Sequence, residues 1–162
     1  ALYCTGGVDL WVNQTDFKNN KSYYPVEADA LSGFLSSTSG ELPDPSGGFE
    51  IAGGITVEQD ASAVTLMDCG FMGNSSHVGG GAIRTASDMT LTGCVLNGND
   101  SYDNGGAVYG FAEVSGPIPH TLQIAFNDCE LSGNNARGLG GAGFVKNCLL
   151  SFNNSFLMTN TA

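Results

Sequence analysis

Residues 64–74 read Val64-Thr-Leu-Met-Asp-Cys69-Gly-Phe71-Met-Gly-Asn74, and this phrase returns twice further along the chain. The second copy is Met89-Thr-Leu-Thr-Gly-Cys94-Val-Leu96-Asn-Gly-Asn99, and the third is Ile124-Ala-Phe-Asn-Asp-Cys129-Glu-Leu131-Ser-Gly-Asn134. In each copy the cysteine precedes the asparagine by five residues, and a Gly-Gly-Ala triplet follows whose alanine lies eight residues after the asparagine. Two spacings shared by three copies indicate an internal repeat.

Two weaker copies stand near the ends of the 162-residue chain. One runs from Leu10 to Asn20 with Thr15 in the cysteine position, and the other runs from Leu150 to Asn160 with Ser155 there. The five asparagines, at 20, 74, 99, 134 and 160, are spaced by 54, 25, 35 and 26 residues. This spacing predicts one domain over residues 1–162, with a base period near 25 and inserted loops at 21–48 and 111–120.

The phrase is typical of a strand, a corner, a second strand and a turn. Val64, Leu66, Cys69 and Phe71 are spaced to face inward, with the corner between Leu66 and Cys69. A coil of about 25 residues cannot bury its apolar face alone, so it must stack on its neighbours. We therefore expect an all-β, right-handed parallel β-helix of about five coils. A β-sandwich of short strands is the alternative, but it does not explain spacings that repeat in register.

Stacking in register predicts three columns of like residues, with successive members about 4.8 Å apart. Glycine pairs would supply the tight corners between strands. The expected columns are apolar (Leu66, Leu91, Phe126 and Phe152), small (Cys69, Cys94 and Cys129) and amide-bearing (Asn20, Asn74, Asn99, Asn134 and Asn160).

The same motifs carry a family resemblance. Phe17-Lys-Asn-Asn20 and Phe71-Met-Gly-Asn74 alternate with Gly-Gly-Val at 6–8, Gly-Gly-Ile at 53–55 and the three Gly-Gly-Ala triplets. This alternation resembles the FxxN and GG[AILV] repeats of the chlamydial polymorphic membrane proteins and of related extracellular proteins with pectin-lyase-like β-helix folds. In that family the repeats build surface adhesins and passenger domains. The resemblance therefore implies a β-helix at the cell surface that is not an enzyme.

The charge balance excludes some partners. Five Lys and Arg stand against 16 Asp and Glu, which gives a formal net charge of −11. Nucleic acid and anionic membrane surfaces are poor partners for such a field. No apolar run approaches the roughly 20 residues of a membrane span, so no membrane insertion is expected.

Five N-x-[ST] sequons, at Asn13, Asn20, Asn74, Asn99 and Asn153, favour a secreted glycoprotein that is extracellular or at the cell surface, with N-linked glycans as partners. Asn13 and Asn153 lie beside inward residues and should face solvent, which makes them the better candidates. The other three belong to the asparagine column, and they can carry glycans only if that column points outward.

The five cysteines include no C-x-x-C pair, so zinc and thioredoxin-type sites are not expected. Cys69, Cys94 and Cys129 would either pack as small apolar residues or bridge one adjacent pair, because stacked positions lie within the Cα limits of a disulfide. Cys4 and Cys148 fall outside the column, and they would pair with each other or between chains.

Some parallel β-helices cleave or bind polysaccharides, so a polysaccharide-active or carbohydrate-binding β-helix is a further alternative. Asp68 and Asp128 share a repeat position, but Gly93 intervenes and leaves them roughly 10 Å apart, two coils away from each other. His77 and His120 have no nucleophile placed by spacing. We therefore expect no enzyme activity, no cofactor, and neither catalytic nor metal-binding residues, with calcium binding left open.

The ends of the sequence suggest assembly. The chain stops just after Asn160 and begins with residues 1–8, whose Gly-Gly-Val triplet would place Val8 ten residues beyond Asn160, against eight in the internal copies. The repeat would therefore nearly continue from the last residue of one chain into the first residues of another. This continuity predicts an extracellular structural protein whose protomers stack head to tail into a glycosylated filament. A fragment of a surface adhesin is the alternative. The residues expected to mediate assembly are Tyr23, Tyr24, Phe156, Leu157 and Met158.

Overall fold

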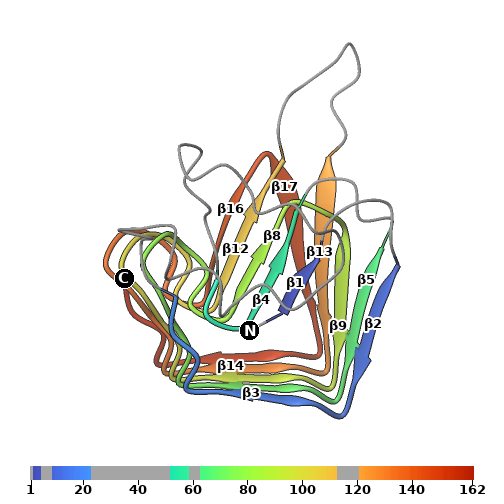
Figure 1. Cartoon of the computed structure of the whole chain (residues 1–162), viewed down its shortest axis with the longest axis horizontal. Coiled ribbons are helices and arrows are strands. Elements are labelled where there is room, and N and C mark those ends of the chain that lie inside the picture. Colours follow the sequence, from blue (N-terminus) through green and yellow to red (C-terminus); the bar gives the residue numbers. More distant parts are fainter. Residues whose placement is uncertain (1, 5–8, 23–51, 59–62, 113–120) are drawn as a thin grey trace, which may run out of the picture.

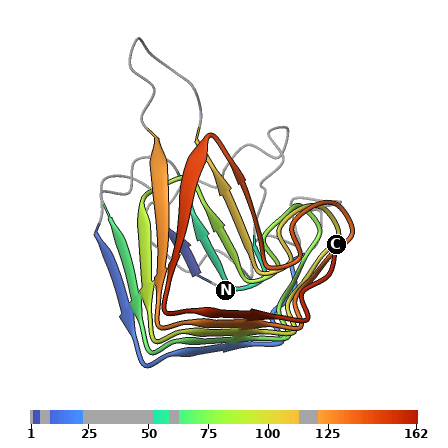
Figure 2. The same cartoon turned by 180° about the vertical axis from the view of Figure 1, so that it is seen from behind.

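A computed structural model describes residues 2–4, 9–22, 52–58, 63–112 and 121–162. Every regular element in these ranges is a β-strand, and every pairing between strands is parallel. The coils lie one above another in chain order, from the blue first coil to the red last coil (Figures 1 and 2). The chain is an all-β parallel β-helix, as the repeat predicts.

The strands form four faces, which we name sheets A to D in chain order; each of the five coils contributes one strand to sheets A, B and C, and the three middle coils contribute one to sheet D. Sheet A contains β1 (Leu2–Cys4), β4 (Ile55–Val57), β8 (Ile83–Thr85), β12 (Val108–Phe111) and β16 (Gly143–Lys146). Sheet B contains β2 (Leu10–Asn13), β5 (Val64–Met67), β9 (Met89–Thr92), β13 (Leu122–Asn127) and β17 (Cys148–Asn153). Sheet C contains β3 (Asp16–Lys18), β6 (Gly70–Met72), β10 (Val95–Asn97), β14 (Glu130–Ser132) and β18 (Phe156–Met158).

Sheet D is the shortest face. It contains β7 (Ser75–Ser76), β11 (Asp100–Ser101) and β15 (Asn135–Ala136), and isolated bridges from Lys21 to Ser75 and from Asn135 to Thr161 extend it to the first and last coils. The described residues therefore form five coils, and the strands of the first and fifth coils are the open edges of the stack.

The bridge at Lys21 corrects the boundary of the first inserted loop, because Lys21 pairs with Ser75 and so belongs to a coil. Phe111 likewise pairs with Lys146 inside sheet A, so the second loop begins after it. The rest of both loops, with Tyr23 and Tyr24, lies outside the described residues.

The core lies between the sheets and consists of the expected columns. Val64, Leu66, Cys69 and Phe71 are all buried, as their spacing predicts. Leu66 pairs with Leu91, the partner of Phe126, and Phe126 pairs with Phe152, which confirms the apolar column.

The corner between sheets B and C depends on one backbone conformation. In every coil the corner residue has a left-handed φ between 48° and 63°, a region that Gly, Asn and Asp adopt most readily. The residues in this position are Gln14, Asp68, Gly93, Asp128 and Asn154. Asp68 lies between Leu66 and Cys69, where the sequence predicts the corner.

The glycine pairs have two separate roles. The first glycine, at Gly80, Gly105 and Gly140, has a left-handed φ of 69° to 73°. The second has an ordinary φ, but its Cα lies against the backbone of the next coil. A Cβ built on Gly106, for example, would collide with the carbonyl oxygens of Gly141 and Asn135.

The Gly-Gly-Ile and Gly-Gly-Val triplets do not occupy the same position in the coil as the three Gly-Gly-Ala triplets, so the expected equivalence of all five is wrong. Ile55 pairs with Ile83, which aligns Gly53 with the second glycine of the next coil. At the N-terminus Leu2 pairs with Ile55, so the Gly-Gly-Val triplet follows its strand instead of preceding it. The Gly-Gly-Val triplet itself lies outside the described residues. Because its strand precedes it, Val8 does not take the position expected from counting ten residues on from Asn160.

Candidate functional site

The asparagine column is a continuous hydrogen-bonded ladder through the stack. The Asn99 Nδ2 donates to Asn134 Oδ1 at 2.9 Å and to the Phe71 carbonyl oxygen at 3.0 Å. The Asn99 Oδ1 accepts from both the backbone N and the Nδ2 of Asn74, each at 3.0 Å. The side chains of Asn74, Asn99 and Asn134 are fully buried, so this ladder satisfies amides that would otherwise be costly inside the core.

The ladder has a direction. Each asparagine donates from its backbone N and its Nδ2 to the Oδ1 of the asparagine in the next coil. No described residue donates to Oδ1 of Asn20, which therefore ends the ladder as an acceptor. At the other end Asn160 donates Nδ2 to the Leu131 carbonyl oxygen, and its backbone N has no described acceptor. One end of the stack thus presents an acceptor and the other presents donors.

Burial excludes two of the predicted glycan sites. Asn74 and Asn99 have no exposed surface, and their amide groups are fully used by the ladder. A glycan on either Nδ2 is incompatible with this packing, so neither is a glycan site of the folded chain. Asn20 is half-buried, and its Nδ2 donates to Asn74 Oδ1 at 2.9 Å.

A serine column explains why the ladder asparagines look like sequons. The Ser76 hydroxyl donates to the Gly79 carbonyl oxygen and accepts from Val78 N. Ser101 makes the same pair of bonds one coil later, to Asn104 and from Asp103. Serine two residues after the ladder asparagine therefore caps the turn, a role that the sequence analysis missed although its spacing was visible.

Asn13 and Asn153 are exposed on the outer side of sheet B, as predicted from their neighbours. Their sequon hydroxyls belong to Thr15 and Ser155, which occupy the cysteine column in the end coils. Each hydroxyl donates to the carbonyl oxygen of its own sequon asparagine. Asn13 and Asn153 are therefore the two sequons with freely accessible side chains, and their glycosylation stays a prediction.

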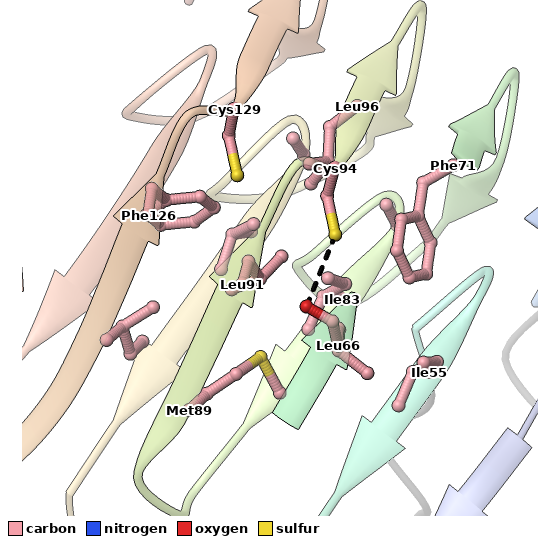
Figure 3. Close-up of a cluster of buried hydrophobic side chains, with 14 of the residues drawn as sticks. Ile55, Leu66, Phe71, Ile83, Met89, Leu91, Cys94, Leu96, Phe126 and Cys129 are labelled. Atoms are coloured by element: carbon pink, nitrogen blue, oxygen red, sulfur yellow. Dashed lines mark hydrogen bonds between the residues drawn. The ribbon is translucent and has the colours of Figure 1, made fainter. Parts of the chain in front are cut away.

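The cysteine column is buried and consists of free thiols, in agreement with the packing interpretation. Figure 3 shows Cys94 and Cys129 on neighbouring coils, with Sγ of Cys94 directed at the Leu66 carbonyl oxygen. The hydrogen bond with the Cys129 thiol, together with burial, raises the pKa of Cys94. The same hydrogen bond lowers the pKa of Cys129, because it stabilises the thiolate of the accepting partner. In the column each cysteine fills the space of a small apolar side chain.

Cys4 and Cys148 lie at opposite ends of the stack, so the expected pairing of these two residues within one chain is wrong. Cys4 belongs to the first coil and Cys148 to the fifth, and four strand spacings amount to about 19 Å. A disulfide requires Cα atoms within about 7 Å. Both thiols are free and half-buried.

We expect a thiol-labelling reagent to modify Cys4 and Cys148 in the native, unassembled protomer and to spare the three core cysteines until unfolding. Burial raises the pKa of both end thiols, so less thiolate is present at pH 8 than in an unhindered cysteine, and labelling should accelerate as the pH rises. Intact mass after N-ethylmaleimide treatment counts the adducts. Cys148→Ser should reduce the count from two to one, and labelling of a third native thiol would contradict the burial of the column.

The acidic and histidine candidates are not brought together. Asp68 and Asp128 are exposed corner residues with Gly93 between them, as predicted, and Asn154 donates to Asp128. The His77 ring stacks on Tyr102 with centroids 4.3 Å apart, while its Nδ1 lies 3.1 Å from the Ser22 carbonyl oxygen. Within the described ranges no three His, Cys, Asp or Glu side chains are placed to hold a metal ion. His120 is not among the described residues.

The open edges expose apolar side chains. Of the predicted assembly residues, Phe156, Leu157 and Met158 are 65%, 45% and 51% exposed on β18. The Phe152 ring stacks on Phe126 at 4.9 Å and leaves its other face open. At the opposite edge the Phe17 ring stacks on Phe71 at 4.9 Å, and the described residues place no coil on its far side. The core columns therefore continue to both ends of the stack without a polar cap among the described residues.

Comparison with known proteins finds no matching family model, no matching curated protein and no matching solved structure. The described part of the chain contains no helix that is long and apolar enough to cross a membrane.

Proposed function

We propose that this chain is an extracellular structural protein whose copies stack head to tail, the fifth coil of one on the first coil of the next, to form a filament. The observation that carries the proposal is the direction of the asparagine ladder. It leaves an acceptor at one end and donors at the other, so identical chains placed in the same orientation have complementary ends. A contact between two different surfaces that does not close on itself generates a fibre.

The ladder supports this contact in detail. In a continued stack the backbone N and the Nδ2 of Asn160 donate to the Asn20 Oδ1 of the next copy. The second Nδ2 hydrogen of that Asn20 then reaches the Leu157 carbonyl oxygen, as Asn74 Nδ2 reaches the carbonyl oxygen of Phe17 inside the chain. These bonds repeat the internal pattern in the next copy, and they form between buried groups, where an unmade bond is costly.

The apolar columns also meet in register. Leu157 belongs to the column of Leu131 and Phe71, so it would pack on Phe17 of the next copy. Phe152 would pack in the same way on Val12. Burial of these side chains removes apolar surface from water at both edges, and it satisfies strand edges that otherwise favour irregular aggregation.

The charge at the edges does not oppose stacking although the chain carries a net charge of −11. The strands of the fifth coil contain one charged residue, Lys146. The strands of the first coil contain Asp16 and Lys18, whose side chains form an ion pair at 2.7 Å. The repulsive acidic groups therefore lie mainly outside the surfaces that would meet.

Leu157→Lys is expected to abolish filaments while the protomer stays folded. The side chain of Leu157 faces the core column at the open edge, and at 45% exposure a lysine there can reach water in the free protomer. In the stack the same lysine would be buried without a counter-charge, which costs several kcal/mol. Negative-stain electron microscopy and sedimentation velocity of the 162-residue chain measure the result.

Met158→Lys is the matched control. Met158 is the next residue, with 51% exposure, but it points to the outer side of sheet C, so filaments should persist. Loss of filaments in both variants would show that added charge alone is responsible. If the unsubstituted chain stays monomeric at high concentration, head-to-tail stacking of copies is wrong. The edges would then accept further coils of one longer chain, as in a surface adhesin.

A further inference from the structure

Asn20 differs from the other sequon residues of the ladder in one amide hydrogen. Its Nδ2 donates one hydrogen to Asn74 Oδ1 at 2.9 Å, and no described residue accepts the second. The corresponding second hydrogen of Asn74 goes to the Phe17 carbonyl oxygen at 2.9 Å. That of Asn99 goes to the Phe71 carbonyl oxygen at 3.0 Å. These carbonyl groups belong to the preceding coil, and the described residues place no coil before the first. Asn20 can therefore lose its second hydrogen without losing a bond to any described residue.

The orientation of the Asn20 amide also suits an N-glycan. Along the ladder each amide accepts on the side of the preceding coil and donates on the side of the following one, as Asn74 does between Asn20 and Asn99. The hydrogen used in the ladder therefore points away from the C=O bond of its own amide. A trans secondary amide keeps its only hydrogen in this position, as the peptide group does. A sugar on Asn20 Nδ2 would replace the second hydrogen and preserve the bond to Asn74 Oδ1.

The residues Asn20-Lys21-Ser22 form a complete sequon, and Asn20 is half-buried at the open edge of the first coil. N-glycosylation transfers an oligosaccharide from a lipid pyrophosphate donor to the asparagine Nδ2. The bond from C1 of the first sugar to the pyrophosphate oxygen breaks, the C1–Nδ2 bond forms, and Nδ2 gives up one hydrogen as a proton. The lipid pyrophosphate is the leaving group. Asn20 needs only the hydrogen that remains, whereas Asn74 and Asn99 use both.

We propose that a glycan on Asn20 closes the first-coil end of the stack and so controls the length of the filament. The proposal rests on the head-to-tail contact of the proposed function. In that contact the second Nδ2 hydrogen of Asn20 meets the Leu157 carbonyl oxygen of the preceding copy. A glycan removes this hydrogen bond, and a sugar ring does not fit between coils about 4.8 Å apart. The modified protomer therefore stays folded but cannot place its first coil on another copy.

The fifth-coil end is not affected by this modification. Asn160 begins the triplet Asn160-Thr161-Ala162, which is not a sequon, so this end keeps the donors of the ladder. A chain glycosylated at Asn20 can therefore join a filament only as the copy whose first coil lies at the very end. Growth stops at that end, and the proportion of glycosylated chains sets the number of protomers in each filament.

The test uses the full 162-residue chain with Asn13→Gln and Asn153→Gln, which remove the two exposed sequons. Secretion from eukaryotic cells is expected to give a folded monomer with one glycan, which mass spectrometry of peptides assigns to Asn20. The same chain produced without N-glycosylation should form filaments in negative-stain electron microscopy. When about one glycosylated chain is mixed with ten unmodified chains before assembly, the mean filament should shorten to about eleven protomers, because each filament accepts one such chain.

Two control variants separate the position of the glycan from its presence. Ser22→Ala in the same background removes the Asn20 sequon but keeps the amide, so the secreted chain should form filaments. Asn13→Gln combined with Ser22→Ala leaves Asn153 as the accessible sequon, on the outer side of sheet B. A glycan on Asn153 should leave the filaments intact, because the side chain of this residue points outward and not between coils.

Each failure has a separate meaning. Absence of filaments from the unglycosylated chain would overturn the proposed function itself. Full-length filaments of chains glycosylated at Asn20 would overturn the closing role and leave the head-to-tail contact intact. A secreted, folded chain without a glycan on Asn20 would overturn the site, and so would a glycosylated chain that circular dichroism shows to be unfolded. Loss of filaments in the control glycosylated at Asn153 would mean that any glycan blocks stacking, which contradicts a specific role for Asn20.

Discussion

Replacing Asn99 by alanine is expected to destabilise the chain by about 3–5 kcal/mol, a shift of roughly 10–15 °C in Tm. The Asn99 side chain is fully buried and takes part in four hydrogen bonds. Alanine removes the acceptor used by Asn74 and the donor used by Asn134 and the Phe71 carbonyl. These groups stay buried, so each loses its hydrogen bond without regaining the solvation that it has in the unfolded chain.

Asn97→Ala is the matched control, because Asn97 lies in the same coil but is exposed on sheet C, where it donates to Ser132 Oγ at 2.8 Å. Its loss should change stability by about 0.5 kcal/mol or less, as is usual for surface positions. Both substitutions are made in the Leu157→Lys protein, so that assembly does not contribute. Urea denaturation then measures the free energy of unfolding of each variant. Equal effects at Asn97 and Asn99 would contradict a stabilising ladder.

Gly106→Ala is expected to have the second largest effect, about 3 kcal/mol or more. Gly106 has an ordinary φ, so the cost does not come from backbone conformation. It comes from the carbonyl oxygens of Gly141 and Asn135, which occupy the place of the new methyl group. Both are backbone atoms of stacked coils, and they can move only if the coils separate and lengthen their ladder bonds.

Gly98→Ala separates crowding from backbone strain. Gly98 has a φ of +63°, but a Cβ built there has no neighbour within 4 Å, so the expected cost is only the roughly 1 kcal/mol of a left-handed alanine. Urea denaturation of the two variants gives the comparison. If Gly98→Ala proves as destabilising as Gly106→Ala, close approach between coils is not what requires glycine at 106.

The fold was predictable because its determinants are fixed spacings. Cys69, Cys94 and Cys129 each stand two residues before an apolar residue (Phe71, Leu96 and Leu131), and a strand with a two-residue period must place both sets on one side. The phase of Gly53 was not predictable, because a Gly-Gly dipeptide has the same appearance whether it precedes a strand by one residue or by two. The pairing of Ile55 with Ile83 decides it.

The candidate site was predictable only in part. The sequence places Asn74 and Asn99 in one column, but an asparagine followed two residues later by serine fits both a glycan site and a ladder with a capped turn. The inward direction follows from the Phe17 and Phe71 carbonyl oxygens, which accept from the amides of the next coil. The direction of the ladder, and with it the difference between the two ends, depends on which amide atom faces which neighbour.

The corners of the coil differ in how far they vary in length. Five residues separate the apolar positions on either side of the B–C corner in every coil, as between Leu66 and Phe71. The A–B corner has no such constancy: paired positions are four residues apart from Thr85 to Met89, and 14 apart from Gly110 to Ile124. New peptide segments can therefore enter the chain at the A–B corner while the stack stays in register. This corner is the place where evolution, or a protein engineer, can add recognition sequences without breaking the stack of coils.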